Sequence, residues 1–213
     1  GINHNGDLQT AKRLIDGAFA TNWDCVKFQK RTPDLCVPHD QKNIEKDTPW
    51  GKMTYLEYRH RVEFGIKEYD YIDKYCTEKP IDWTASVWDL ESLKFMKKYK
   101  VPFIKIPSAM LTNNELLLEA CKSGIPVLLS TGMSTLEEID SAVLLLKKHA
   151  SQYALLVCNS SYPARLDELN LRLIPAFKKK YGCTIGYSGH EYGLDPTTIA
   201  VSLGAQIIER HIT

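Results

Sequence analysis

Two histidines have the residue type and the spacing to bind a metal ion. His190 and His211 each follow closely on a short apolar run, and carboxylates stand beside them at Glu191 and Glu209. If these runs are neighbouring parallel strands, both imidazoles lie at the same edge of one sheet. Imidazole and carboxylate groups bind divalent transition metals, so His190 and His211 are candidate metal ligands. The alternative is two neutral imidazoles that are hydrogen-bonded in a packed interior.

The other apolar runs also end in side chains that could bind an anion. Ammonium and hydroxyl donors together can replace the water around a phosphate or carboxylate. Lys105 lies inside an apolar run, where an unpaired ammonium would be costly, so it should face an anion or a carboxylate. Alternatively, the lysine stems pack while their heads reach solvent, and the serines satisfy backbone groups at turns. The polar candidates at these ends are Lys27, Gln29, Ser86, Lys105, Ser108, Ser130, Ser160, Tyr162 and Ser188.

The elements that position these residues alternate along the chain. Continuous apolar runs predict strands of a helix-covered parallel sheet. They cover residues 25–29, 81–87, 101–106, 126–130, 153–158, 183–187 and 205–209. Amphipathic helices are expected between them, over residues 8–19, 55–76, 90–99, 114–122, 136–149, 171–181 and 196–203. Ser134 and Glu137 predict a capping box, and Gly132 and Gly189 are expected in turns after strands.

Repeated βα units indicate an α/β protein, either a doubly wound sheet or a (β/α)8 barrel. Residues 1–6 resemble the end of an eighth strand, so counting favours a (β/α)8 TIM barrel that is truncated or incompletely observed at both ends. Active sites of such barrels lie at the carboxyl ends of the strands. The predicted domain therefore spans residues 1–213 and carries its site at that rim.

Composition predicts a globular enzyme of ordinary character. The 213 residues are 44% hydrophobic and 25% charged, enough for one sizeable core. Lys and Arg number 27 against 26 Asp and Glu, so the charge balance gives no indication of nucleic acid or an anionic membrane as a partner. Six scattered cysteines predict buried thiols in a reducing cytoplasm, and we find no apolar run long enough for a membrane span.

Eight strand-end motifs occur in order along nearly the whole chain. They are GINHNGD, VKFQKR, TAS, FIKIPS, LLSTGM, CNSSYPA, GYSGHEYG and IERHIT. Together they resemble the sialic acid synthase (N-acetylneuraminate synthase) family of phosphoenolpyruvate-condensing enzymes. The resemblance implies a (β/α)8 catalytic barrel, followed by a C-terminal antifreeze-like domain that is absent from these residues, in a homodimer. It also implies a transferase that joins phosphoenolpyruvate to the aldehyde of N-acetylmannosamine or a related amino sugar, with release of phosphate by C–O cleavage.

The resemblance also implies roles for the candidate residues. His190 and His211 would bind Mn²⁺, or else Mg²⁺ or Co²⁺, which would polarise the sugar aldehyde. Most of the lysines and serines would surround phosphoenolpyruvate, whereas Gln29 and Tyr162 would lie near the sugar. Proton transfer requires a carboxylate, and the candidate catalytic residues are Lys105 and Glu209. The residues matched to phosphoenolpyruvate are Lys27, Ser86, Lys105, Ser108, Ser130, Ser160 and Ser188.

The chain departs from the family pattern at three places. One functional glutamate of the family would precede Gly1, a second acidic position is occupied by Met110, and Asn159 is shifted relative to the usual asparagine.

Two alternative functions remain open. An aldolase could form a Schiff base on Lys105 or Lys27, since burial can lower the pKa of a lysine. A non-catalytic barrel that binds a sugar or a phosphate is the other alternative.

Overall fold

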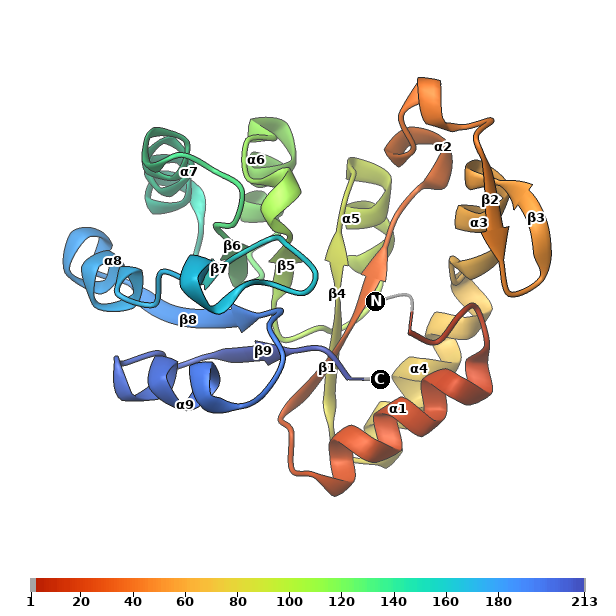
Figure 1. Ribbon diagram of the computed structural model, residues 1–213, viewed down its shortest axis with the longest axis horizontal. Helices are drawn as coiled ribbons and strands as arrows, with labels where there is room; N and C mark the ends of the chain where they lie inside the picture. Colours follow the sequence, from red (N-terminus) through yellow and green to blue (C-terminus); the bar gives the residue numbers. More distant parts are fainter. Residues whose placement is uncertain (1–2, 213) are drawn as a thin grey trace. The chain divides into compact units, whose positions relative to one another are not determined.

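The computed structural model describes residues 3–212, which fall into two compact units. Unit 1 extends to Pro102 and includes Ile212, whereas unit 2 comprises Phe103–His211. In both units parallel strands alternate with helices, so the predicted α/β class is confirmed (Figure 1). No helix within residues 3–212 combines the length and the apolar character that crossing a lipid bilayer requires.

Unit 1 is built on two parallel strands, β1 and β4. Their register places Lys27 opposite Thr84 and Gln29 opposite Ser86. Helix α1 packs against α4 beside them (Figure 1). The elements are α1 (Leu8–Ala20), β1 (Cys25–Lys30), α2 (Pro33–Cys36), η1 (His39–Gln41), β2 (Glu45–Thr48), β3 (Gly51–Thr54), α3 (Tyr55–Val62), α4 (Ile66–Glu78), β4 (Asp82–Val87) and α5 (Leu90–Met96).

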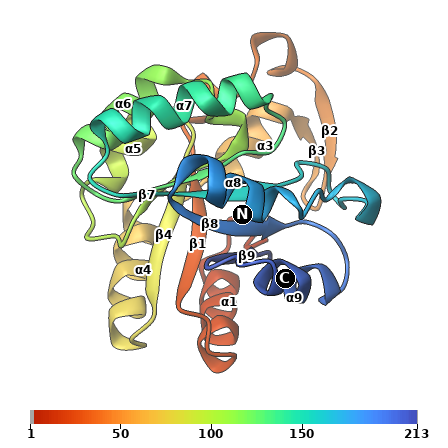
Figure 2. The same ribbon diagram turned by 90° about the vertical axis from the view of Figure 1, so that its left-hand side faces the viewer.

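Unit 2 contains five parallel strands whose spatial order follows the chain, from β5 to β9. Helices α6 and α7 lie side by side next to these strands (Figure 2). The elements are β5 (Ile104–Ile106), η2 (Ser108–Met110), α6 (Asn114–Lys122), β6 (Val127–Ser130), α7 (Leu136–His149), β7 (Tyr153–Cys158), η3 (Leu166–Glu168), α8 (Leu173–Tyr181), β8 (Thr184–Gly189), α9 (Asp195–Ser202) and β9 (Ile208–Arg210).

One face of the unit 2 sheet changes from apolar to polar along the strands. Leu128, Ala154 and Leu156 form a buried cluster, against which Phe103 and Ile207 pack. Side chains alternate between the two faces of a strand, so the residues two positions further along share this face. Lys105, Ser130 and Glu209 therefore lie on the same face as this apolar cluster, nearer the carboxyl ends of their strands.

Two corrections concern helices. The single helix predicted over residues 55–76 is interrupted after α3, because Glu63 is extended and Gly65 begins α4 with its N–H bound to Glu68. The capping box of α7 is formed by Thr135 and Glu138, one residue later than predicted.

Strand positions also differ from the predictions. A hairpin of β2 and β3 lies where no strand was expected, because its exposed residues show no apolar pattern. Strand β5 begins only at Ile104, since Pro102 has no N–H to pair. Gly189 lies inside β8 rather than in the following turn.

Other predictions hold in part. The expected end of an eighth strand falls partly on residues 1–2, outside the described residues, and residues 3–6 form turns. Six free cysteines are present in the structure, of which Cys76 and Cys121 are buried, whereas the other four are only half-buried. The prediction of buried thiols is therefore wrong for those four.

Candidate active site

Lys105 is the centre of a buried polar cluster in unit 2. Its ammonium group is 2.5 Å from the Ser130 hydroxyl and 3.8 Å from Oε1 of Glu209. The Ser188 hydroxyl donates to the same Glu209 oxygen at 2.8 Å. Lys105 is 1% exposed, so its charge is neutralised inside the protein rather than by solvent. The cluster offers an ammonium group, two hydroxyls and one carboxylate.

Strand register explains why these residues meet. Ser188 of β8 is paired with Glu209 of β9, and Cys158 of β7 is paired with Ser188. Lys105 is opposite Leu128 of β6, so Ser130 follows two residues later on the same face. Residues that are distant in sequence thus become neighbours at the carboxyl ends of adjacent strands.

The two candidate metal ligands converge on one phenol. The Tyr162 hydroxyl lies 2.7 Å from Nε2 of His190 and 3.1 Å from Nε2 of His211. Nδ1 of His190 contacts the Asn159 carbonyl at 2.5 Å. A carbonyl only accepts, so this contact assigns the proton to Nδ1 and leaves the Nε2 lone pair of a neutral ring directed toward Tyr162. Two ring nitrogens therefore face the same small region.

The donor set at this position is incomplete for a metal held by protein alone. Within residues 3–212, no group of three or more His, Cys, Asp or Glu side chains is arranged to hold a metal ion. His190 and His211 nevertheless have their ring centroids 5.2 Å apart. A divalent ion bound there would need further ligands from substrate or water.

Glu191 has a structural partner that the sequence did not reveal. Its carboxylate forms an ion pair with Arg210 and accepts a hydrogen bond from the Tyr187 hydroxyl at 2.7 Å. Burial acts to raise the pKa of Glu191, but the hydrogen bond from Tyr187 and the contacts with Arg210 outweigh it and lower the pKa. Of the two carboxylates beside the histidines, only Glu209 contacts the Lys105 cluster. No sequence pattern predicts this division of roles between Glu191 and Glu209, because it depends on which strand lies next to β8.

Ser108 and Ser160 lie next to Gly132, at the end of β6. The Ser108 hydroxyl accepts a hydrogen bond from the Gly132 N–H at 3.0 Å. A Cβ atom at Gly132 would lie 2.5 Å from the Ser160 Oγ and 2.9 Å from the Ser108 Oγ. Glycine is therefore required for two hydroxyls to approach the backbone here. Met110 ends the short η2 turn that begins at Ser108.

The remaining candidates belong to unit 1. Lys27 and Gln29 lie on β1 and are half-buried, whereas Ser86 lies on β4 and is buried. Gln29 is directly opposite Ser86 in the strand register, so these two are neighbours. The candidate residues thus form one group on β1 and β4 and a second group on β5 to β9.

A comparison with protein families shows to which family this chain belongs. The NeuB family profile matches residues 14–213, which is almost the whole chain. The chain belongs to the NeuB family. The resemblance to sialic acid synthases that the eight motifs indicate is therefore confirmed.

Individual members of the NeuB family are similar over the full length of this chain. The N-acetylneuraminate-9-phosphate synthase of Drosophila melanogaster is 38% identical over 219 residues, which cover 100% of this chain and 58% of that protein. The N,N'-diacetyllegionaminic acid synthase of Campylobacter jejuni is 33% identical over 218 residues, and the match covers 100% of this chain and 65% of that protein. This chain therefore spans about 60% of the length of these curated relatives.

A solved structure supports the same relationship. The N-acetylneuraminic acid (sialic acid) synthetase of Leptospira borgpetersenii, in complex with citrate, superposes with a TM-score of 0.91 at 35% identity. The match covers 100% of this chain and 70% of that chain. The fold of the described residues is thus that of a NeuB family protein.

Proposed function

We propose that the protein condenses phosphoenolpyruvate with the open-chain aldehyde of N-acetylmannosamine or a related amino sugar. The products would be phosphate and a sialic acid or related nonulosonic acid. The observation that carries this proposal is the buried cluster of Lys105, Ser130, Ser188 and Glu209 in a NeuB family chain. It combines cationic and hydroxyl donors, which an anionic substrate needs, with a carboxylate that can accept a proton.

In this reaction C3 of phosphoenolpyruvate attacks the aldehyde carbon, and the aldehyde oxygen gains a proton. Water adds to C2 and loses one proton, and the C2–O bond to phosphate then breaks as the new hydroxyl gives its remaining proton to the leaving phosphate and C2 becomes a ketone. We assign Lys105 and the serine hydroxyls to the anionic groups of phosphoenolpyruvate, whose charge they would stabilise. Glu209 is the candidate for proton transfer because its carboxylate accepts a hydrogen bond from Ser188 and forms an ion pair with Lys105.

We propose His190 and His211 as the ligands of a divalent ion, for which Mn²⁺ is our first choice and Mg²⁺ or Co²⁺ the alternatives. The convergence of both Nε2 atoms on the Tyr162 hydroxyl supports this assignment. When bound, the ion would supply Lewis-acid polarisation of the sugar aldehyde. The Asn159 carbonyl would orient the His190 ring through Nδ1, as outer partners of metal-binding histidines commonly do.

Several features of the whole protein also belong to the proposal. The alternation of strands and helices in both units and the NeuB membership support a (β/α)8 barrel as the complete catalytic domain. The antifreeze-like domain, the homodimer and the cytoplasmic location stay predictions.

The test is an assay of the full-length protein with phosphoenolpyruvate, amino-sugar acceptors and Mn²⁺. We expect phosphate release and a nonulosonic acid product by mass spectrometry, and no lysine adduct after borohydride treatment. Lys105→Met should lower kcat/KM by roughly 100-fold or more, since it removes a donor to developing charge. Lys148→Met, an exposed lysine of α7, is the matched control and should retain activity. A borohydride-trapped adduct, or full activity in Lys105→Met, would contradict the proposal.

The metal assignment has its own readout. His190→Ala and His211→Ala should each abolish turnover and weaken Mn²⁺ binding in calorimetry, while the far-ultraviolet circular dichroism stays that of the wild type. Unchanged Mn²⁺ affinity in both variants would rule out these two histidines as ligands.

A further inference from the structure

One buried ion pair of unit 2 lies next to both histidines that are proposed to bind the divalent ion. In the chain, His190 is followed by Glu191, and His211 is preceded by Arg210. Glu191 and Arg210 form an ion pair in which the Glu191 side chain is 0% exposed and the Arg210 side chain 17%. Each member of this pair is therefore the chain neighbour of one candidate metal ligand.

The register of β8 and β9 places the ion pair on the face of the sheet opposite the candidate site. Gly189 of β8 is paired with Arg210 of β9, and Ser188 is paired with Glu209 (Figure 1). Because side chains alternate along a strand, Gly189 and Arg210 face away from the site. One residue further along each strand, the two histidines return to the face of the site.

The Arg210 guanidinium extends from β9 to the segment that follows β8. It donates to the Glu191 carboxylate, to the Glu191 carbonyl at 2.8 Å and to the Gly193 carbonyl at 3.1 Å. It also donates to the Thr197 hydroxyl of α9 at 3.3 Å. A guanidinium carries its donors in fixed directions, so these contacts hold the backbone that directly follows His190 in one position relative to β9.

The ion pair itself is held in place by its other neighbours. The second carboxylate oxygen of Glu191 accepts a hydrogen bond from the Tyr187 hydroxyl at 2.7 Å, so both carboxylate oxygens have a donor. A Cβ atom at Gly189 would clash with the Arg210 guanidinium and would lie 2.9 Å from both carboxylate oxygens. Glycine at position 189 therefore makes room for the ion pair beside the backbone of β8.

His190 is also held from the side of β7. The Ala164 N–H donates to the His190 carbonyl at 3.2 Å, and Nδ1 of His190 contacts the Asn159 carbonyl at 2.5 Å. These contacts orient the ring, but neither of them reaches β9. Backbone pairing between β8 and β9 ends at Gly189 and Arg210, so beyond that point the guanidinium continues the connection between the two strand ends.

We infer that the Arg210–Glu191 ion pair sets the separation of His190 and His211, so that both Nε2 atoms can bind one divalent ion. This inference rests on the proposed function, in which the two histidines are the ligands. A metal site needs its ligands within about 0.5 Å of the productive geometry, and residues that support the ligands supply that precision. Arg210 and Glu191 are thus positioning residues, which act on the ion only through the histidines.

The experiment measures the Mn²⁺ dissociation constant of the full-length protein by calorimetry, and the Mn²⁺ concentration that gives half-maximal turnover. Arg210→Met removes every donor of the guanidinium and should weaken Mn²⁺ binding about 10- to 100-fold, the range typical of outer partners of metal ligands. Half-maximal turnover should require correspondingly more Mn²⁺. Arg210→Lys retains a charge for Glu191 but cannot reach all the acceptors at once, so its affinity should lie between those of the wild type and Arg210→Met.

Two further variants separate the position of the ion pair from its contribution to stability. Gly189→Ala keeps both charges but displaces the pair, and it should weaken Mn²⁺ binding by about 10-fold. Lys30→Met is the matched control, because it breaks a buried ion pair with Glu63 in unit 1. It should lower the melting temperature but change the Mn²⁺ dissociation constant by less than about twofold. Circular dichroism at the assay temperature identifies the variants that are folded, and if Arg210→Met is not, Arg210→Lys and Gly189→Ala decide.

Failure of the inference is distinct from failure of the proposed metal site. If the wild type binds Mn²⁺ through the histidines and the Arg210 and Gly189 variants bind it equally well, the ion pair serves only stability and the inference is overturned. An equal loss of affinity in Lys30→Met would overturn it as well, because the effect would then follow from any loss of stability. If the wild type does not bind Mn²⁺, the metal assignment itself fails and the inference fails with it.

Discussion

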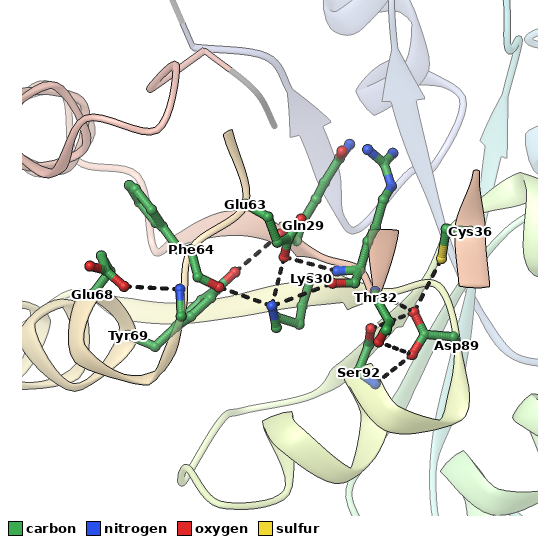
Figure 3. Close-up of polar contacts among 12 residues, drawn as sticks. Gln29, Lys30, Thr32, Cys36, Glu63, Phe64, Glu68, Tyr69, Asp89 and Ser92 are labelled. Atoms are coloured by element: carbon green, nitrogen blue, oxygen red, sulfur yellow. Dashed lines mark hydrogen bonds and ion pairs between the residues drawn. The ribbon is translucent and has the colours of Figure 1, made fainter. Parts of the chain in front are cut away.

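Replacement of Asp89 by alanine should destabilise unit 1 more than the loss of an ordinary helix cap. Asp89 caps α5 by accepting from the Ser92 N–H at 2.7 Å. The same carboxylate accepts from the Thr32 N–H at 2.8 Å, from the Thr32 hydroxyl at 2.9 Å and from the Cys36 thiol at 3.2 Å (Figure 3). One carboxylate therefore connects the end of β1, helix α2 and helix α5.

The magnitude follows from these contacts. A lost N-cap costs about 1 kcal/mol, and hydrogen bonds to a charged acceptor contribute about 1.5 kcal/mol or more each. Because Asp89 is only half-buried and water can replace part of this network, we expect a loss of about 2–4 kcal/mol for Asp89→Ala. That loss corresponds to a fall in Tm of roughly 5–15 °C for a chain of this size. Thermal and guanidinium unfolding followed by circular dichroism measure it.

Asp7→Ala is the matched control. Asp7 caps α1 with hydrogen bonds from Gln9 and Thr10 alone, all of them local and exposed. Its replacement should cause a clearly smaller loss than Asp89→Ala. If the two variants lose the same stability, the contacts of Asp89 with Thr32 and Cys36 contribute nothing and the reasoning is refuted.

The effect of Asp89 should also depend on pH. Burial acts to raise the pKa of Asp89, but hydrogen bonds from Ser92, Thr32 and Cys36 outweigh it and hold the pKa below its ordinary value of 3.8. A lowered carboxyl pKa contributes stability that is complete above the unfolded pKa and is lost as the pH falls through the folded pKa. The difference between wild type and Asp89→Ala should therefore be constant near pH 7 and shrink below about pH 4. A difference that grows in acid would contradict the assignment.

Two further predictions concern packing and buried charge. Lys30 and Glu63 form an ion pair in which both side chains are only 11% exposed. Lys30→Met leaves the Glu63 carboxylate without its ammonium partner, so the free energy of unfolding should fall by about 3 kcal/mol. Adding Glu63→Leu should restore part of that loss. Denaturant unfolding of both variants measures these losses. If the double variant Lys30→Met, Glu63→Leu is less stable than Lys30→Met alone, the unpaired Glu63 carboxylate is not the cause of the loss. In Gly186→Ala the added Cβ would lie 2.4 Å from Leu156 Cδ2, so the variant should lose roughly 1–3 kcal/mol of stability. Gly17→Ala in α1 is the control, because its Cβ would have no contact closer than 3.6 Å. Its stability should be unchanged or slightly raised. Equal melting temperatures for the two glycine variants would refute the close approach.

Sequence patterns predicted the buried elements better than the exposed ones. Helices α6 and α7 and strand β7 begin and end at the predicted residues, because their apolar residues recur with a clear period. The hairpin of β2 and β3 is exposed and shows no such period. The capping box was misplaced by one residue because Ser134 and Thr135 each precede a glutamate at the required spacing, so the motif alone could not choose between them.

Features that depend on distant residues were the ones that sequence could not reveal. The interruption between α3 and α4 is fixed by Glu63, whose partner Lys30 lies 33 residues earlier. The partner of Glu191, which follows β8, is Arg210 of β9, 19 residues away. By contrast, the prediction that Lys105 must face a carboxylate or an anion required only the cost of burying a charge, and Glu209 occupies that position.

In both units, the alternation of side chains along a strand places charged residues that stabilise the fold on one face and charged residues that can contact a ligand on the other. Lys30 and Arg31 are consecutive cations, yet they lie on opposite sides of the strand direction, where one is paired with Glu63 and the other is stacked on Trp88. Consecutive residues of β9 divide in the same way. Glu209 accepts from Ser188 in the candidate site, whereas the next residue, Arg210, is committed to an ion pair on the other face. In a parallel sheet of this kind, the face that a charge occupies and the partner that neutralises it therefore indicate whether it serves the fold or a ligand, and charge alone does not.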